Sequence, residues 1–311
     1  MPSPTVAIID IGSNSIKLLV ASKKTDGTIE EIFQSTEETR IGHGIGIKNP
    51  VLRENSMRRA LTSVRILLSK SKDYNAVTTD IIATSAVRDS SNHQEFAQRI
   101  KEETGISLRI LSGKTEAQLI GQGVRCDPAI RNLKNFYHFD LGGGSLECIS
   151  FENSLQMQKK SLPLGSVRMT EKWIKKPEYP FSKKNAMDIG ENVARELKSS
   201  GFTISANSNA PAILTGGSAT NVRFLLSDDQ LNPSAIIPLK KLEELLEKIA
   251  PLNLEERRKI NGLPAERADI FPAALITLIT ISLLGNFDRF RHSFYNLRYG
   301  IASELLQKLE A

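Results

Sequence analysis

The chain has 311 residues, 40% of them hydrophobic. That length suits two domains of roughly 150 residues, each with its own core. Basic residues exceed acidic ones by a net charge of +6, with a pI of about 9.2, which favours a polyanionic partner. The basic residues are scattered and only 6% of residues are aromatic, so a nucleic-acid partner is not expected.

Two cysteines, Cys126 and Cys148, are too few for a disulfide framework and fit no zinc spacing. The first residues lead directly into an apolar strand, without a secretory signal. The most apolar stretch, residues 270–284, is short for a membrane span and contains Pro272, so it predicts a buried helix. We therefore expect a cytoplasmic protein with no membrane partner, and a homodimer is left open.

The first half predicts three strands, followed by alternating helices and strands. Apolar runs bounded by turn residues predict the strands, and apolar residues spaced by three or four predict the first helix. The strands are expected at residues 5–11, 16–22, 28–35, 80–83 and 107–111. The helices are expected at residues 57–68, 93–104 and 115–124, and Gly105 is the expected C-cap of the second.

The second half restarts this pattern and then departs from it. Strands are expected at residues 136–140, 146–151, 155–161 and 212–215, with a helix at 184–199 and a polar loop at 200–211. From residue 239 onward the chain is expected to be mainly helical. We place the domains at residues 1–124 and 125–311, and a C-terminal helix at 302–309 is a candidate to complete the first domain.

One phrase occurs in both halves. Asp-Ile-Gly-Ser-Asn-Ser-Ile-Lys at residues 10–17 corresponds to Asp-Leu-Gly-Gly-Gly-Ser-Leu-Glu at residues 140–147. Each copy lies between two apolar runs, so each predicts a tight turn between two strands. Successive backbone amides in such turns form a concavity that binds anions, and two facing turns would clamp phosphate. Either copy alone reads as an ordinary hairpin, but two copies that keep Asp, Gly and Ser favour the phosphate clamp.

These phrases resemble those of the Ppx/GppA family of exopolyphosphatases and guanosine pentaphosphate phosphohydrolases. Five further segments match in order, so that the resemblance covers nearly the whole chain. They are residues 83–89, 111–117, 161–168, 215–218 and 262–269. The resemblance implies an α/β fold of two duplicated actin-like ATPase (ribonuclease H-like) domains, with the site in the cleft between them. Thr115 and Tyr299 depart from the family pattern, in which an acid stands at these positions.

Hydrolysis of a terminal phosphoryl group needs a residue that activates water, a clamp on the anionic oxygens and a metal that neutralises charge. On its own, Glu116 reads as an acid at the start of a helix, where the helix dipole stabilises it. The resemblance places it at the position of the general base. Asp140 and Glu147 are the candidate metal ligands, because carboxylate oxygens suit Mg²⁺.

Phosphate binding is assigned to two arginines and to the two turns. Arg88 and Arg267 are selected by their places in the matched segments, because a guanidinium can hold two phosphate oxygens at once. The amide and hydroxyl donors would come from Ser13, Asn14, Ser15, Gly143, Gly144 and Ser145. Residues 216–218 form a candidate third turn. The histidines, His43, His93, His138 and His292, show no metal spacing and are interpreted as structural.

We therefore expect a Mg²⁺-dependent exopolyphosphatase that releases terminal phosphate from inorganic polyphosphate. Hydrolysis of guanosine pentaphosphate is the alternative, because the same chemistry would act on a guanosine polyphosphate. A sugar or acetate kinase shares the duplicated fold, but Glu116, Arg88 and Arg267 argue against it. A sensor that binds guanosine polyphosphates without turnover is disfavoured by the presence of both Glu116 and Glu147.

Overall fold

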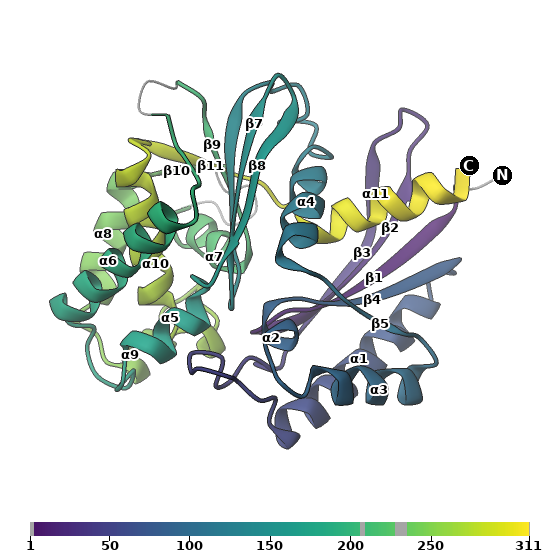
Figure 1. Ribbon diagram of the computed structural model, residues 1–311, viewed down its shortest axis with the longest axis horizontal. Coiled ribbons are helices and arrows are strands. Elements are labelled where there is room, and N and C mark those ends of the chain that lie inside the picture. Colours follow the sequence, from purple (N-terminus) through teal and green to yellow (C-terminus); the bar gives the residue numbers. More distant parts are fainter. Residues whose placement is uncertain (1–2, 206–208, 228–234, 311) are drawn as a thin grey trace. The chain divides into compact units, whose positions relative to one another are not determined.

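The computed structural model describes residues 3–205, 209–227 and 235–310, and its elements are labelled in Figure 1. Contacts divide the chain into two compact units. Unit 1 comprises Met1–Asn132 and Tyr295–Ala311, and unit 2 comprises Leu133–Phe294. From the sequence we expected a boundary after Val124, with a C-terminal helix as a candidate to complete the first domain.

Unit 1 contains a five-stranded sheet in the order β3-β2-β1-β4-β5. Its strands are β1 Thr5–Ile11, β2 Ser15–Lys23, β3 Ile29–Glu38, β4 Thr78–Ala83 and β5 Leu108–Ile110. The strand pairs β1–β2 and β2–β3 are antiparallel, whereas β1–β4 and β4–β5 are parallel. The apolar runs of β1 and β2 are almost wholly buried, as expected for central strands covered on both faces.

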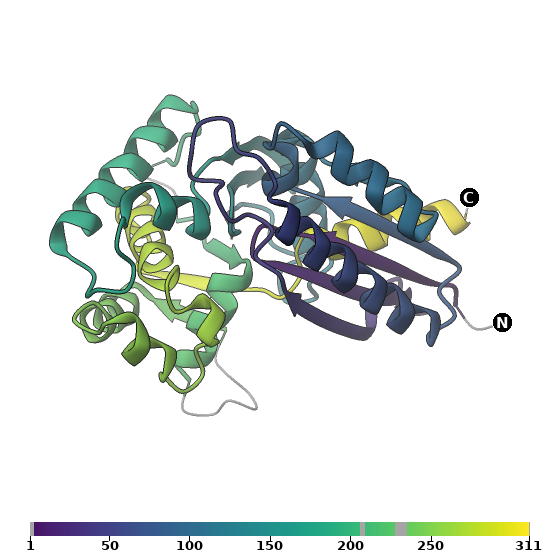
Figure 2. The ribbon, with the colours of Figure 1, turned by 90° about the horizontal axis from the view of Figure 1, so that it is seen from below.

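Helices cover both faces of this sheet. The helices of unit 1 are α1 Glu54–Lys72, α2 Ser85–Arg88, α3 His93–Thr104, α4 Gly113–Val124 and α11 Leu297–Glu310. Figures 1 and 2 show α11 along one face and α1 with α3 along the other. The C-terminal helix therefore packs on the first sheet, and it begins at Leu297 rather than at the expected residue 302.

Unit 2 contains a six-stranded sheet in the order β10-β11-β9-β6-β7-β8. Its strands are β6 Phe136–Leu141, β7 Leu146–Glu152, β8 Leu155–Leu162, β9 Ala212–Thr215, β10 Ile236–Pro238 and β11 Arg289–His292. Its helices are α5 Ser166–Trp173, α6 Lys183–Ser199, α7 Gly217–Leu225, α8 Leu239–Ile249, α9 Leu254–Arg258, the 3₁₀ helix η1 Ala265–Arg267 and α10 Phe271–Leu284.

The two sheets repeat one topology. The order β8-β7-β6-β9-β11 in unit 2 matches β3-β2-β1-β4-β5 in unit 1, with the same parallel and antiparallel pairs. Each copy of the repeated phrase forms the end of the first strand, the turn and the start of the second strand. The predicted fold class, α/β with two duplicated actin-like units, is confirmed.

Helix α10 forms the centre of the helical layer of unit 2. Residues 271–279 are all buried, and the helix packs against α5, α6 and α8. A helix that is apolar on every side is expected to be buried in this way, and Pro272 is tolerated because it lies in the first turn. The prediction of a buried helix at residues 270–284 is confirmed.

From residue 239 onward the chain is mainly helical, as expected, and β11 Arg289–His292 is a short strand within this part. Other features of the fold were not expected from the sequence. The short helices α2, α5 and α7 were not predicted, since each is too short to show a helical period. In the polar loop predicted at 200–211, residues 200–205 and 209–211 form no helix or strand, and residues 206–208 lie outside the described part.

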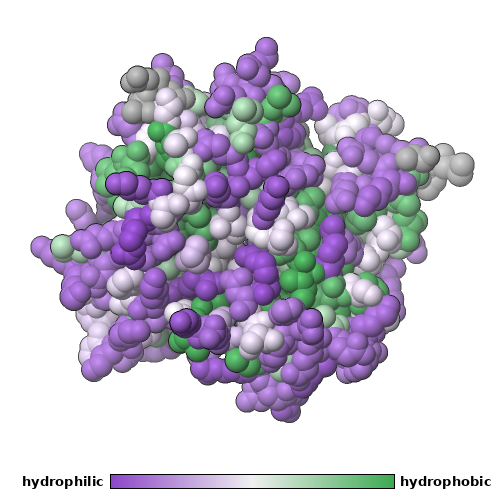
Figure 3. Space-filling model, viewed as in Figure 1, coloured by the Kyte–Doolittle hydropathy of each residue, from purple (hydrophilic) through white to green (hydrophobic). Residues whose placement is uncertain are grey.

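In the described part of the chain, no helix combines the length and the apolar character needed to cross a membrane. The face drawn in Figure 3 carries mainly hydrophilic residues, with hydrophobic residues in separate patches. The cytoplasmic location and the homodimer stay predictions.

Candidate active site

The predicted site residues of unit 1 lie at one edge of its sheet. The turn after β1, helix α2 after β4 and helix α4 after β5 all follow the C-terminal ends of parallel strands, which meet at the same edge. Ser13 Oγ lies 3.2 Å from Ser85 Oγ, so the turn contacts the first residue of α2. Ser13, Asn14 and Ser15 are all buried.

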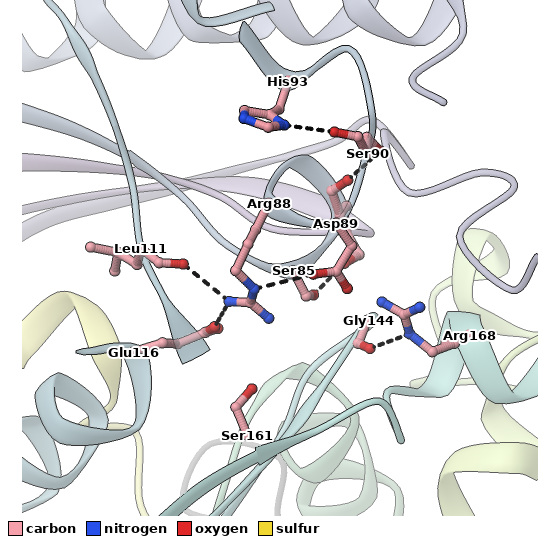
Figure 4. Close-up of polar contacts among 12 residues, drawn as sticks. Ser85, Arg88, Asp89, Ser90, His93, Leu111, Glu116, Gly144, Ser161 and Arg168 are labelled. Carbon is pink, nitrogen blue, oxygen red and sulfur yellow. Dashed lines mark hydrogen bonds and ion pairs between the residues drawn. The ribbon is translucent and has the colours of Figure 1, made fainter. Parts of the chain in front are cut away.

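Arg88, the last residue of α2, directs its guanidinium at Glu116 (Figure 4). Its Nη1 donates to Glu116 Oε2 at 2.5 Å and to the Leu111 carbonyl at 3.2 Å, while its Nε donates to Asp89 Oδ1 at 3.2 Å. Glu116 is only 4% exposed, and a paired cation offsets part of the cost of burying its charge. The structure thus brings together the candidate base and one candidate phosphate ligand.

Helix α4 is capped by a residue other than Glu116. Ser112 Oγ accepts a hydrogen bond from Thr115 N at 3.1 Å, and the two hydroxyls lie 2.8 Å apart. Ser and Thr side chains are good acceptors at this position, so the cap needs no acid. Thr115, where the family pattern has an acid, therefore belongs to the helix cap, and the Glu116 carboxylate is bonded to Arg88 instead.

The first turn is held by the segment that follows β3. Gly42 N donates to the Ser13 carbonyl at 2.8 Å, and Arg40 N donates to the Asn14 carbonyl at 2.7 Å. The Asn14 side chain is held at both ends, since Arg40 Nε donates to its Oδ1 at 3.0 Å and its Nδ2 donates to Glu38 Oε2 at 2.6 Å. The turn is therefore fixed by both backbone and side-chain hydrogen bonds.

The second turn is held in the same way by the segment that follows β8, the N-terminus of α5. Three N–H groups of α5 donate hydrogen bonds to three successive carbonyls of the turn. The bonds run from Ser166 N to Gly142 O (3.0 Å), from Val167 N to Gly143 O (2.8 Å) and from Arg168 Nε to Gly144 O (2.8 Å, Figure 4). A Cβ on Gly165, the N-cap, would clash with the backbone of Gly143 and Gly144, so only glycine permits this approach.

These carbonyl contacts orient the amides of both turns. In a trans peptide unit the N–H points opposite to the C=O of the preceding residue. Because the carbonyls of residues 142–144 point at α5, the amides of Gly143, Gly144 and Ser145 point away from it. The same reasoning directs the amides of Asn14 and Ser15 away from the segment that follows β3. Successive amides that share a direction form an anion-binding concavity.

A row of four polar side chains crosses the sheet of unit 2 beside its turn. Thr215 pairs with Asp140, Asp140 with Glu147, and Glu147 with Ser161, on the neighbouring strands β9, β6, β7 and β8. Thr215 Oγ1 donates to Asp140 Oδ2 at 2.6 Å, and Ser161 Oγ donates to Glu147 Oε1 at 2.7 Å. We call these four residues the polar row. Its carboxylates are buried, with Asp140 7% and Glu147 1% exposed.

Behind the polar row lies His138, two residues before Asp140 on β6. Its Nε2 lies 2.9 Å from Thr215 Oγ1. Complete burial lowers the pKa of His138 to about 3, so the imidazole is neutral at ordinary pH. The histidine interpreted as structural from the sequence is therefore in hydrogen-bond contact with the hydroxyl that holds a candidate metal ligand.

Arg267 lies against the third predicted turn, residues 216–218 of unit 2. It ends η1, is 8% exposed, and sits so close to the start of α7 that a Cβ on Gly217 would clash with its Nη1. Gly216 has φ = +103°, a conformation that favours glycine, and a Cβ there would clash with the Leu141 carbonyl. The start of the third turn thus packs against the end of β6, the strand that leads into the second turn, and Arg267 lies beside the third turn.

The donor set of the polar row can be tested against Mg²⁺. In the described residues no group of three or more His, Cys, Asp or Glu side chains is arranged for a metal. Mg²⁺ does not need one, because it is usually held by one or two carboxylates together with waters and substrate phosphates. Two buried carboxylates on directly paired residues also repel one another unless a cation or a proton lies near them. Asp140 and Glu147 therefore fit Mg²⁺.

Several residues of this site were not assigned from the sequence. Thr215 and Ser161 lie in segments that the family resemblance picked out, but their contacts depend on strand register and not on local sequence. Arg168 and Arg40 hold the two turns and were not singled out. Their positions in the repeat could have identified them, because each follows the third strand of its repeat.

A separate cavity of about 330 Å³ in unit 1 contains none of the predicted site residues. It is lined by Lys23, at the end of β2 far from Ser15, and by residues of α11 such as Leu306. Because it lacks the candidate base and the turns, we do not assign the reaction to it.

Comparison with known proteins identifies the family of the chain. The chain matches the Ppx/GppA phosphatase family over residues 19–309. A bifunctional 3-dehydroquinate synthase/phosphatase from Fusobacterium nucleatum is 35% identical over 201 residues, which are 62% of this chain and 30% of that protein. The matched part of the chain thus spans less than a third of that relative's length.

Solved structures share the fold. An exopolyphosphatase from Cytophaga hutchinsonii superposes with a TM-score of 0.87 at 22% identity, covering 98% of each chain. The Aquifex aeolicus member of the Ppx/GppA family superposes with a TM-score of 0.79 at 22% identity, covering 100% of each chain.

Proposed function

Because the chain belongs to the Ppx/GppA phosphatase family, we propose that it is a Mg²⁺-dependent exopolyphosphatase that hydrolyses terminal phosphate from inorganic polyphosphate. The observation that carries the proposal is the polar row of unit 2. It places two buried carboxylates beside a turn whose amides are oriented to bind an anion. Carboxylates and anion-binding amides at one place suit a ligand that is itself a complex of metal and phosphate.

In this proposal unit 1 supplies the group that activates water. Water attacks the terminal phosphorus, the bond from that phosphorus to the bridging oxygen breaks, and Glu116 takes the proton of the attacking water. Arg88 would bind phosphate oxygens through the same guanidinium that bonds Glu116 in this structure. Substrate that draws Arg88 away would leave Glu116 able to accept that proton.

Unit 2 supplies the ligands for charge neutralisation. Asp140 and Glu147 would hold Mg²⁺, and when bound the ion would neutralise charge that develops on the phosphate oxygens. The amides of Gly143, Gly144 and Ser145 would donate to further oxygens, and Arg267 would bind phosphate at the third turn.

A long polyphosphate is favoured over a small nucleotide by one feature of β8. Lys159 lies two residues before Ser161, so both side chains point to the face of the sheet that carries the carboxylates. A cation there is placed to bind phosphate units beyond the terminal one. The net charge of +6 is consistent with a polyanionic substrate.

The deciding experiment compares phosphate release from long-chain polyphosphate, guanosine pentaphosphate and ATP, with and without Mg²⁺. We expect release from polyphosphate, dependent on Mg²⁺ and lost in Glu116→Gln. Faster release from guanosine pentaphosphate would replace the proposed substrate with the alternative one. Release of phosphate from ATP alone would contradict both.

A further inference from the structure

We propose that His138, Thr215 and Ser161 are positioning residues that orient the two metal-binding carboxylates of unit 2. The inference rests on the proposed function only in taking Asp140 and Glu147 as the ligands of Mg²⁺. His138 acts through Thr215 on Asp140, and Ser161 acts directly on Glu147. None of the three touches substrate in this proposal.

The hydrogen bonds that link His138, Thr215 and Asp140 form what we call the polar chain. Counting the available hydrogens shows which atom donates in each of its bonds. Thr215 has a single hydroxyl hydrogen, and it is donated to Asp140 Oδ2 at 2.6 Å. The contact of 2.9 Å between Thr215 Oγ1 and His138 Nε2 must then be donated by the imidazole. His138 is therefore the tautomer with its proton on Nε2. Each donor in such a chain polarises the next, which strengthens the bond to the carboxylate.

The fold itself does not require these polar side chains. Strands β6 and β9 already pair through their backbones, and both His138 and Thr215 are fully buried, where polar groups are unfavourable unless they are bonded. Unit 1 has the same strand pair with other residues. At the positions equivalent to His138 and Thr215 it has Ile8 and Ile82, which are also fully buried.

The two units therefore show the same backbone with and without the polar chain. Where the carboxylate is paired with a second carboxylate, as Asp140 is with Glu147, both receive hydroxyl hydrogens. Carboxylates that bind metals are commonly held by such outer hydrogen bonds, which fix their orientation before the ion arrives. This is why we assign the polar chain to metal binding and not to folding.

The test removes one hydroxyl at a time and measures metal binding without substrate. Mn²⁺, a paramagnetic substitute for Mg²⁺, is titrated into the full-length protein and followed by electron paramagnetic resonance. Thr215→Val should weaken Mn²⁺ binding by about 10-fold or more, since loss of an outer hydrogen bond typically reduces metal affinity 10- to 100-fold. Thr215→Ser keeps the hydroxyl and should restore binding to near the wild-type value.

The matched control is Thr277→Val in α10. Thr277 is as fully buried as Thr215, but its hydroxyl donates to the Ala273 carbonyl within the helix. The Thr277→Val variant should bind Mn²⁺ with the affinity of the wild type. In activity assays Thr215→Val should raise the Mg²⁺ concentration for half-maximal rate while keeping most of kcat at saturating Mg²⁺, a split that general loosening of the fold would not produce.

Ser161→Ala and His138→Ile provide second routes if Thr215→Val does not fold. Ser161 is only half-buried, and His138→Ile reproduces the residue of unit 1. Both should weaken Mn²⁺ binding, and ¹⁵N NMR of the wild type should show His138 protonated at Nε2. Wild-type Mn²⁺ affinity in folded variants that lack these hydrogen-bond donors would overturn this inference and leave the metal assignment standing. Failure of the wild type to bind Mn²⁺ would overturn the metal assignment and this inference together.

Discussion

The two hairpins that carry the repeated phrase differ at one decisive position. In unit 1 the register pairs Asp10 with Lys17, whereas in unit 2 it pairs Asp140 with Glu147. The hairpin of unit 1 thus contains its own cation opposite the aspartate. The hairpin of unit 2 places two carboxylates there, and like charges on directly opposite residues repel one another. The two units thus share the backbone of this hairpin but carry opposite charges at one position, and only unit 2 has the pair of carboxylates that we propose as metal ligands.

The turns themselves show the opposite behaviour, because different sequences hold them in the same way. In unit 1 an irregular segment that includes Arg40 donates hydrogen bonds to the turn carbonyls. In unit 2 the start of helix α5, which includes Arg168, donates the equivalent bonds. In both cases the carbonyls face the segment after the third strand and the amides face away from it. The orientation of the amides is therefore the shared property of the repeat.

The proposed general base, Glu116, lies in unit 1, and Glu116→Gln tests its role with the largest expected effect. The amide keeps the shape of the side chain but cannot take a proton. We expect kcat to fall about 10²- to 10⁴-fold, because a general base typically contributes that much. Substrate binding should be retained, as measured by equilibrium dialysis with polyphosphate. Activity above a tenth of the wild type would remove Glu116 from this role.

The charge difference between the hairpins can be abolished by Glu147→Lys. This change gives unit 2 the pairing of unit 1, with the ammonium group in place of the metal. We expect the Mg²⁺ concentration for half-maximal rate to rise by more than about 100-fold, beyond the effect of losing an outer hydrogen bond. The matched control is Glu152→Lys, the same charge change at the exposed end of β7. An unchanged Mg²⁺ dependence would contradict the metal assignment.

The comparison also shows what could be predicted from sequence. The repeat is visible in the sequence because its residues are local to each turn, so both hairpins were predicted correctly. The phosphate-binding role of Ser13–Ser15 and Gly143–Ser145 stays a prediction. The polar row was only half found, because Thr215 and Ser161 reach Asp140 and Glu147 through pairings that span 75 and 14 residues of sequence. Strand register across such distances is a tertiary property, not a local one.

Glu116 illustrates the same limit on local reasoning. At the start of a helix an acid is ordinarily explained by the helix dipole, and nothing nearby in the sequence points to a partner. Its partner Arg88 is the last residue of α2. This helix has four residues, so it is too short to be predicted from helical periodicity. The family resemblance named both residues separately, and only the fold shows that they are bonded.

Acid should destabilise unit 2, because it buries two histidines, whereas His43 and His93 of unit 1 are at least partly exposed. Burial, and then the neighbouring Arg223, lower the pKa of His292 to about 3. The unfolded chain takes up this proton near pH 6.5, so the native state loses stability as pH falls from about 6.5 toward 3. The loss per histidine is at most about 1.4 kcal/mol for each pH unit.

Urea unfolding at several pH values measures this effect. The sole tryptophan, Trp173, lies in α5 and reports on unit 2. His292→Gln should reduce the dependence of unfolding free energy on pH between 6.5 and 4, and His93→Gln in unit 1 should leave it unchanged. Equal slopes for the wild type and His292→Gln would show that His292 is protonated in the folded state.

The third strands of the two repeats differ in charge, and this difference predicts the smallest effect. At the positions of Lys159 and Lys160 in unit 2, unit 1 has the neutral residues Gln34 and Ser35. Alternation along β8 puts Lys159 on the face of the carboxylates and Lys160 on the opposite face. If polyphosphate extends along β8, only Lys159 meets it.

Charge reversal at these two lysines separates the faces. Lys159→Glu should raise KM for long polyphosphate about two- to fivefold, the effect of one partly exposed charge, and Lys160→Glu should change it less. Binding of several phosphate units displaces counterions, so added salt should raise KM for long chains more than for tripolyphosphate. Lys159→Glu should reduce the difference in salt dependence of KM between long chains and tripolyphosphate. Equal salt dependence for long and short chains would exclude binding along β8 and leave a single terminal-phosphate site, at which guanosine pentaphosphate would be as good a substrate as polyphosphate.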